Sequence, residues 1–438
     1  MTAAWLDRLR LPAMVVLTLA AVALALVVGY AVPHHPTLVV AGVALMLVAT
    51  VALTQPMLLP LLAMPLVVVV ARAGGGGVDL TVSDLMLGLA FWPAVIFAPR
   101  PFSEPMRQLL WLNLLYQALT LFTVIANPFS ANVVEWFHAW LIVSGALIVG
   151  WAVGATGNAR LGLTLFLLAC LGLALPTIVQ GLLQYATGNF APVYPRWPYE
   201  MHKNFIGNLL CFAAILAYAR PAWLGWKAEP ASVAFWIFVG AILVSQSRQA
   251  IVGLAVGLLV ISFREHGERR RPVLALLGVV PLVALVSTLA RDQIAEDNEF
   301  NSWFQRLDWY AESFQIWQSR PLTGYGLRYW TQEGAPAAYQ PPNAFLEVMA
   351  SSGLTGLLGF LVLVGGSLWV LWRVDPAFGT LGLALVLSRL VQGQFDLFWV
   401  SIAVTVPFLL TGVALGAASA TARSVARSRD LPRAVVGV

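Results

Sequence analysis

The run NAFLEVMASSGLTGLLGFLVLVGGSLWVLW, residues 343–372, is long and apolar enough to cross a bilayer as one helix. Its only charged residue is Glu347, which stands one helical turn after Asn343 at the start of the run. A carboxylate in an otherwise apolar helix is costly in a membrane and typical of a functional position. The run therefore predicts a membrane protein with a polar site at one end of its spans.

The composition of the whole chain supports this prediction. Of its 438 residues, 60% are hydrophobic and only 10% are charged, with a mean hydropathy of +0.82. We therefore expect an all-α, polytopic integral membrane protein with about 12–14 transmembrane helices, forming a single domain over residues 1–438. The apolar runs lie near residues 11–32, 36–54, 56–71, 80–98, 108–126, 135–154, 160–186, 202–219, 231–245, 249–263, 272–290, 343–372, 377–393 and 398–418. Cys170 and Cys211 both fall inside such runs, so neither a disulfide framework nor a metal cluster is expected, and no cofactor is predicted.

The net charge of +5 and the pI near 9.4 are explained by membrane topology. If the N-terminus is cytoplasmic, most lysines and arginines fall in cytoplasmic segments, above all in REHGERRRP, residues 264–272. This distribution follows the positive-inside rule and argues against nucleic acid as a partner. We expect a multi-pass protein of the cytoplasmic membrane with both termini in the cytoplasm.

The same topology places residues 291–342 outside the membrane, in a loop of about fifty residues. Within it, NSWFQRLDWYAESFQIWQS, residues 301–319, has aromatic and aliphatic residues at helical spacing. The apolar positions are Trp303, Leu307, Tyr310, Phe314 and Trp317. We predict an amphipathic helix over residues 301–318 that lies along the outer interface and covers a cavity.

Two arginines at this outer boundary suit an anionic ligand, because the planar guanidinium matches phosphate oxygens. Arg248 stands in a very short turn between two apolar runs, and Arg306 projects from the loop helix. Together they could clamp a diphosphate. The alternatives are a snorkelling surface arginine at each position, or a pairing of Arg306 with Asp308 or Glu312.

His202 and Lys203 begin a span at the same boundary. A histidine there is either a catalytic group or an interfacial hydrogen-bonding residue. Glu347 has two interpretations as well. It is either a desolvated carboxylate suited to base chemistry or a hydrogen-bonding partner of a neighbouring arginine.

Three stretches of the chain resemble the O-antigen ligase and polymerase superfamily of bacterial envelope glycan assembly. They are SQSRQAIVGLAVGLL (245–259), RLDWYAESFQIWQSRPLTGYG (306–326) and NAFLEVMASSGLTGLLGFL (343–361). The resemblance implies an inverting, metal-independent glycosyltransferase that works outside the cytoplasmic membrane. Such an enzyme moves a glycan from an undecaprenyl-diphosphate carrier to an acceptor hydroxyl, so its partners are a polyprenyl-diphosphate-linked donor, a glycan or glycolipid acceptor, and the bilayer. By the same resemblance, Arg248 and Arg306 would hold the diphosphate.

The chain departs from the family pattern at one position. The family has a histidine immediately before the asparagine of the third stretch, and here that position is Pro342. The candidates for the catalytic base are therefore Glu347, which we favour, His202 and Asp308. The residues expected to bind substrate beside them are Asn343, Lys203 and Ser247.

A transporter or flippase of lipid-linked sugars would have a similar composition. Such a protein should carry charged or helix-breaking residues deep within its spans. Four prolines within apolar runs fit that alternative, namely Pro65, Pro93, Pro176 and Pro281. Polar residues gather on one side of the membrane under the predicted topology, and this distribution favours the enzyme.

Overall fold

The structure is a computed structural model that describes residues 46–47, 50–51, 54–72, 80–264, 302–337 and 339–430. The side chains of residues 302–306 and 427–430 are excluded from that description. The chain forms two compact units, Met1–Leu59 and Pro60–Val438, and the candidate site lies wholly within the second. The predicted single domain over residues 1–438 stays a prediction.

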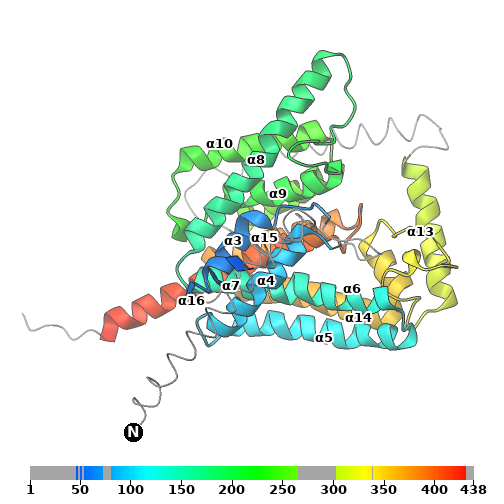
Figure 1. Cartoon of the computed structure of the whole chain (residues 1–438), viewed down its shortest axis with the longest axis horizontal. Coiled ribbons are helices and arrows are strands. Elements are labelled where there is room, and N and C mark those ends of the chain that lie inside the picture. Colours follow the sequence, from blue (N-terminus) through cyan, green and yellow to red (C-terminus); the bar gives the residue numbers. More distant parts are fainter. Residues whose placement is uncertain are drawn as a thin grey trace, which may run out of the picture. The chain divides into compact units, whose positions relative to one another are not determined.

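Helices account for the regular structure of the described residues, where one isolated β-bridge joins Arg72 to Thr81 (Figure 1). The main helices are α3 (Leu58–Leu66), α4 (Val82–Phe97), α5 (Glu104–Ala126), α6 (Ser130–Trp140), α7 (Ala146–Ala155), α8 (Ala159–Ala186), α9 (Lys203–Ala219), α10 (Ala228–Ser245), α11 (Arg248–Arg264), α13 (Ser302–Ser319), α14 (Ala344–Arg373), α15 (Pro376–Gln392) and α16 (Ser401–Asp430). A π-helical turn, η1 (Leu141–Gly145), joins α6 to α7, and a short 3-10 helix, η3, covers Tyr329–Thr331. The predicted all-α class is confirmed.

Six helices in the described ranges are long and apolar enough to cross a membrane, so the chain is a multi-pass membrane protein. They cover Glu104–Ala126, Ser130–Ala155, Ala159–Ala186, Ala228–Ser245, Ala344–Arg373 and Ser401–Ala426. Three shorter apolar helices cover Val82–Phe97, Lys203–Ala219 and Pro376–Gln392. The predicted spans at 11–32 and 272–290, and most of 36–54, lie outside the described residues.

The predicted span at 56–71 is not a full crossing. Helix α3 ends at Leu66 after nine residues, and the chain beyond it pairs with the start of α4. The backbone N–H of Val82 donates to Ala71 O at 3.0 Å, and that of Ser83 donates to Val69 O at 3.0 Å. These hydrogen bonds pair backbone C=O groups of the extended segment, which would have bonded within the helix if α3 had continued.

Helices α7 and α16 approach each other through small residues. A Cβ added at Gly150 would lie 2.0 Å from Leu409 O, and one added at Gly154 would lie 2.2 Å from Val413 O. From the other side, a Cβ at Gly412 would lie 2.3 Å from Leu147 O. Each helix therefore presents glycines four residues apart, which is how membrane helices bring their backbones into contact.

Helix α14 is broken at Gly353, which has φ 64° and ψ −159° inside the helical run. The backbone groups that the break releases pair with the loop after α13. Leu354 N donates to Pro321 O at 2.8 Å, and Gly326 N donates to Ser351 O at 2.8 Å. Non-helical backbone at membrane depth is stable only where it is satisfied by protein in this way. The second and third family-like stretches therefore form one structural unit.

Polar side chains of the α5–α6 corner fix this loop. Asn127 Nδ2 donates to Gly324 O at 3.3 Å, and Leu327 N donates to Asn132 Oδ1 at 2.9 Å. Arg320 Nη1 donates to Asn127 Oδ1 at 3.1 Å. The loop is thus held on two sides, by the break in α14 and by the end of α5.

The amphipathic helix predicted over residues 301–318 is present as α13, and it packs against α14 (Figure 1). Its Tyr310 hydroxyl donates to Gln394 O at 3.2 Å, and the Ser313 side chain is buried. Part of the predicted external loop, residues 291–301 and residue 338, lies outside the described residues.

Candidate active site

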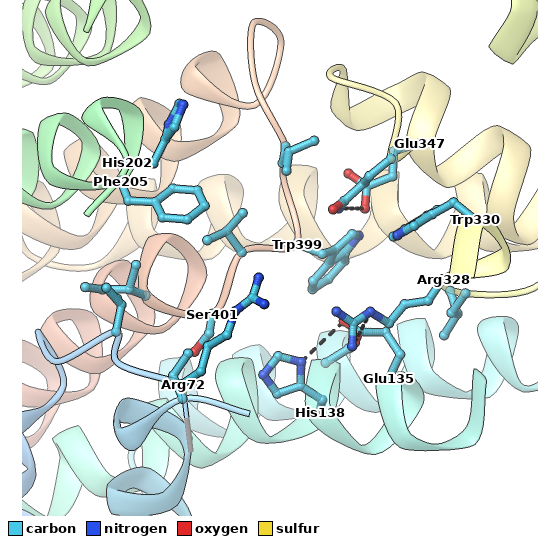
Figure 2. A pocket seen from close by; sticks show the side chains of 18 of the residues that line it. Arg72, Glu135, His138, His202, Phe205, Arg328, Trp330, Glu347, Trp399 and Ser401 are labelled. Atoms are coloured by element: carbon cyan, nitrogen blue, oxygen red, sulfur yellow. Dashed lines mark hydrogen bonds and ion pairs between the residues drawn. The ribbon is translucent and has the colours of Figure 1, made fainter. Parts of the chain in front are cut away.

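A cavity of about 440 Å³ lies among α5, α6, α9, α14 and the segments that precede α4 and α16 (Figure 2). Its volume lies within the range of about 300–1,000 Å³ that is usual for small-ligand pockets. Charged and aromatic side chains contribute much of its wall. They are Arg72, Tyr116, Glu135, His138, Glu200, His202, Phe205, Arg328, Trp330, Glu347 and Trp399.

Glu347 lies in the first turn of α14 and is only 2% exposed. Asn343 caps that turn, because its Oδ1 accepts from the N–H groups of Phe345 and Leu346 at 3.0 and 3.2 Å. Gln340 Nε2 donates to Glu347 Oε1 at 2.7 Å, and Phe398 N donates to Oε2 at 3.2 Å. Both carboxylate oxygens are therefore held in place at the cavity wall by hydrogen-bond donors.

The segment that supplies one of those donors is itself anchored by a buried arginine. Arg389 of α15 donates from Nη2 to Leu397 O at 2.6 Å and to Phe398 O, and its guanidinium lies 4.8 Å from the centre of the Phe398 ring. Since Phe398 N holds Glu347, Arg389 orients the carboxylate through one intervening residue.

A chain of ionic groups forms another part of the wall. His138 Nε2 lies 3.1 Å from Asp84 Oδ1, and His138 Nδ1 lies 3.3 Å from Glu135 Oε1. Ionised carboxylates only accept hydrogen bonds, so this arrangement favours a ring that donates from both nitrogens and is cationic. Asp84 also accepts from Thr81 N at 2.8 Å and from the Ser401 hydroxyl.

Arg328 continues this chain. Its Nε lies 3.7 Å from Glu135 Oε2. The residue has φ 57°, in the left-handed region that side chains with a Cβ seldom adopt. Figure 2 shows Arg72, His138 and Arg328 on one side of Trp399, with Glu347 on the other. The cavity therefore has a mixed-charge wall and a carboxylate wall, separated by an aromatic ring.

Two local features place the chain of ionic groups. Thr81 and Asp84 form a capping box at the start of α4, in which each side chain accepts from the other's backbone N–H. Glu135 and His138 are three residues apart on α6, so they lie on one face. The π-helical turn at Leu141–Gly145 follows directly, and such turns are frequent at functional sites.

His202 is the N-cap of α9, and its Nδ1 accepts from Asn204 N at 3.3 Å. Its ring lies edge-on to Tyr194, with ring centres 5.4 Å apart. Partial burial lowers the pKa of His202 below its ordinary value of 6.5, although Asp396 opposes this shift and Lys203 adds to it. An accepting Nδ1 and a lowered pKa both favour the neutral ring.

The three family-like stretches meet at the segment 394–396, beside the cavity. Gln249 Nε2, next to Arg248, donates to Asp396 Oδ2 at 3.2 Å. Asn343 Nδ2 donates to Gln394 O at 3.2 Å, and Tyr310 OH of α13 donates to the same oxygen at 3.2 Å. Residues 397 and 399–402 of the same segment line the cavity. We call this meeting point of Gln249, Tyr310 and Asn343 with residues 394–396 the motif cluster. One stretch of backbone thus connects the motif cluster to the cavity wall.

The predicted site residues divide into three groups in the structure. Glu347 and His202 line the cavity. Four others lie near them without lining it: Arg248 begins α11, Lys203 begins α9, Asn343 caps α14, and Ser247 is buried in the turn before α11. Asp308 and Arg306 are both on α13. Asp308 is exposed, and the side chain of Arg306 is not among those that the structure describes. The roles assigned to all eight residues stay predictions.

Six ionisable residues around the cavity were not predicted from the sequence. They are Arg72, Asp84, Glu135, His138, Glu200 and Arg328. A signal for three of them was available, because ionisable residues at the edges of apolar runs mark functional positions. Glu135 and His138 begin the run at 135–154, and Asp84 lies in the run at 80–98.

The fold and the cavity define a multi-span membrane protein in which several ionisable residues line an internal pocket. Among the described residues, no group of three or more His, Cys, Asp or Glu side chains is placed to hold a metal ion.

Residues 233–361 match the family model described as O-antigen ligase. This match confirms the resemblance to the O-antigen ligase and polymerase superfamily that the sequence predicted. It covers most of α10, all of α11 and α13, and the first part of α14, and it includes both Arg328 and Glu347. A comparison with curated proteins finds no match. Residues 233–361 of this chain are thus similar to O-antigen ligases, and this similarity supports an enzyme of envelope polysaccharide assembly.

Proposed function

We propose that this protein transfers a glycan from an undecaprenyl-diphosphate carrier to an acceptor hydroxyl at the outer face of the cytoplasmic membrane. The observation that carries the proposal is the meeting of the three family-like stretches at residues 394–396, next to a cavity lined by a buried carboxylate. This arrangement supports a donor site at the motif cluster and an acceptor site in the cavity.

In the proposed reaction, Glu347 is the general base. Its carboxylate takes the proton from the acceptor hydroxyl as that oxygen attacks the anomeric carbon of the donor sugar. The bond from the anomeric carbon to the phosphate oxygen breaks, and the carrier diphosphate leaves with the bonding electrons. Attack opposite the leaving group inverts the anomeric configuration.

The leaving diphosphate gains negative charge as the bond breaks, so cations near it stabilise the transition state. Arg248 and Arg306 stay our proposed ligands for it. The position of Arg248 supports this role, because it begins α11 beside Gln249, which contacts Asp396 in the motif cluster. No step of the proposed reaction requires a metal ion.

The transporter alternative gains little support from the break in α14. Transporters use interrupted helices to bind substrate with the released backbone groups. Here the released groups at Ala350, Ser351 and Leu354 pair with residues 321–326 of the same chain. The break therefore fixes a loop, and we keep the enzyme as the proposed function.

The test is transfer of a labelled glycan from its undecaprenyl-diphosphate carrier by the purified protein with an envelope extract as acceptor. We expect Glu347→Gln to lower the rate by about 10²–10⁴-fold, the usual contribution of a general base. Glu333→Gln is the matched control, because Glu333 is exposed and does not line the cavity. A Glu347→Gln rate equal to that of the wild type would refute the base assignment.

The same assay tests the other parts of the proposal. Arg248→Ala and Arg306→Ala should each lower transfer, while Arg107→Ala, an exposed residue on α5, should not. EDTA should leave the rate unchanged, and NMR of the product should show an inverted anomeric centre. An inert wild-type protein would refute the transferase reaction and favour the transporter.

A further inference from the structure

The charge pattern of the cavity differs from that of a diphosphate site. Two arginines and the cationic His138 line it, but so do three carboxylates, those of Glu135, Glu200 and Glu347. Glu135 already contacts both His138 and Arg328, and a second carboxylate, Asp84, lies behind His138. A phosphate placed between these walls would lie near several like charges, which repel it strongly in a site of low dielectric.

Neutral hydroxyl groups suit such a wall. A hydroxyl both donates and accepts, so one ring with several hydroxyls satisfies carboxylates and guanidinium groups together. Arg328 presents a planar fork with five donors in total, and its contact with Glu135 holds that fork at the cavity wall. Glu347 faces the cavity with both oxygens already oriented. The wall therefore matches a polyhydroxylated ligand without net charge.

The aromatic residues supply the complementary apolar surface. The ring of Trp399 stacks on Tyr116, with centres 5.2 Å apart and planes at 16°, and meets Phe398 edge-on at 5.2 Å. These contacts fix Trp399 as a rigid plate that lines the cavity. Trp330 is held edge-on against Tyr329 at 5.3 Å. A sugar ring has an apolar C–H face and a polar rim, so it matches an aromatic plate surrounded by ionic hydrogen-bonding groups.

We infer that the cavity is a binding subsite for one neutral sugar ring, with Trp399 and Trp330 against its C–H face and Glu135 and Arg328 on its hydroxyls. The inference rests on the proposed function for the source of that ring, which is either the acceptor glycan or the first sugar of the donor.

Binding without transfer tests the subsite directly. Saturation-transfer NMR on the full-length protein in nanodiscs would use a panel of free glucose, galactose, mannose and N-acetylglucosamine, with glucose 6-phosphate and glucuronate as charged counterparts. We expect at least one neutral sugar to bind, and each charged counterpart to bind at least tenfold more weakly. Tighter binding of glucose 6-phosphate than of glucose, or binding of none of the neutral sugars, would overturn the inference.

Variants assign the binding to the cavity. Trp330→Ala and Glu135→Gln should each weaken sugar binding at least fivefold, whereas Trp111→Ala should not, because Trp111 is exposed on α5 and lies outside the cavity wall. Trp330→Tyr keeps an aromatic face and should retain binding if the alanine variant fails to fold. Unchanged binding in Trp330→Ala and Glu135→Gln, with normal melting temperatures, would place the sugar elsewhere.

The transfer assay distinguishes the two sources of the ring. An apparent KM raised for the envelope extract in Glu135→Gln identifies an acceptor subsite, and one raised for the lipid-linked donor identifies a donor-sugar subsite. If the wild type binds a neutral sugar but transfers nothing, the subsite stands and the proposed reaction fails.

Discussion

Replacing Gly353 by alanine should destabilise the protein and detach the loop at residues 321–326 from α14. The backbone at Gly353 has φ 64° and ψ −159°, a combination that is essentially restricted to glycine and costs other residues about 1–3 kcal/mol. The new Cβ would also lie 2.3 Å from Leu322 O and 2.4 Å from Leu322 C. Relieving such a clash requires a backbone shift that costs about another 1–3 kcal/mol.

The two costs together amount to about 2–6 kcal/mol, so the melting temperature should fall by several degrees. Gly365→Ala on the same helix is the matched control. A Cβ at Gly365 would meet nothing within 4 Å, and its helical backbone favours alanine by about 0.5–1 kcal/mol. Thermal unfolding in detergent, followed by tryptophan fluorescence, measures both variants.

Opposite shifts of the two melting temperatures are the expected result. A Gly353→Ala protein that melts at or above the wild-type temperature would refute the broken-helix account, because an unbroken α14 would tolerate alanine at that position. The transfer rate of Gly353→Ala should fall as well, since the break lies six residues after Glu347 and fixes the loop that carries Arg328.

Three further perturbations have defined outcomes. Gly150→Ala should prevent normal folding because its Cβ would lie 2.0 Å from Leu409 O, whereas Gly172→Ala, with open space around it, should fold. The yield of folded protein after detergent extraction measures both variants. Arg264→Gln should lower stability by about 2 kcal/mol or more, because the Arg264 guanidinium donates to three carbonyls at the end of α14; unfolding temperature reports the loss. Stability should decline as pH falls below about 6.5, because the pKa of His202 is lower in the folded state and the unfolded state therefore binds the proton first. Melting curves from pH 5 to 8 measure this decline, and His202→Asn should make it smaller.

Each of these has a result that contradicts its reasoning. Equal yields of the Gly150 and Gly172 variants would mean that α7 and α16 do not meet backbone to backbone. A wild-type melting temperature for Arg264→Gln would show that water or lipid satisfies the α14 carbonyls equally well. A pH profile that His202→Asn leaves unchanged would assign the decline to another group.

The sequence by itself determined the membrane class, the positions of most helices and the family resemblance. These features depend on local properties. Apolar length decides which segments favour the bilayer, and the spacing of aromatic residues decided the helix Ser302–Ser319. It also indicated Glu347 and His202, because a polar residue at the edge of an apolar run stands out without any knowledge of its neighbours.

Only the tertiary structure decided the break in α14 and the composition of the cavity. A helical sequence pattern runs through Gly353. The break is stable because residues 321–326, which lie in a separate segment of the chain, form hydrogen bonds with the released backbone groups. In the same way, Asp84, Glu135 and Arg328 come from three separate segments. Their contacts through His138 and Glu135 depend on how the helices pack. Hydrophobicity along a chain decides which segments enter the membrane, but the pairing of polar groups between segments is set by distances that only the packed structure contains.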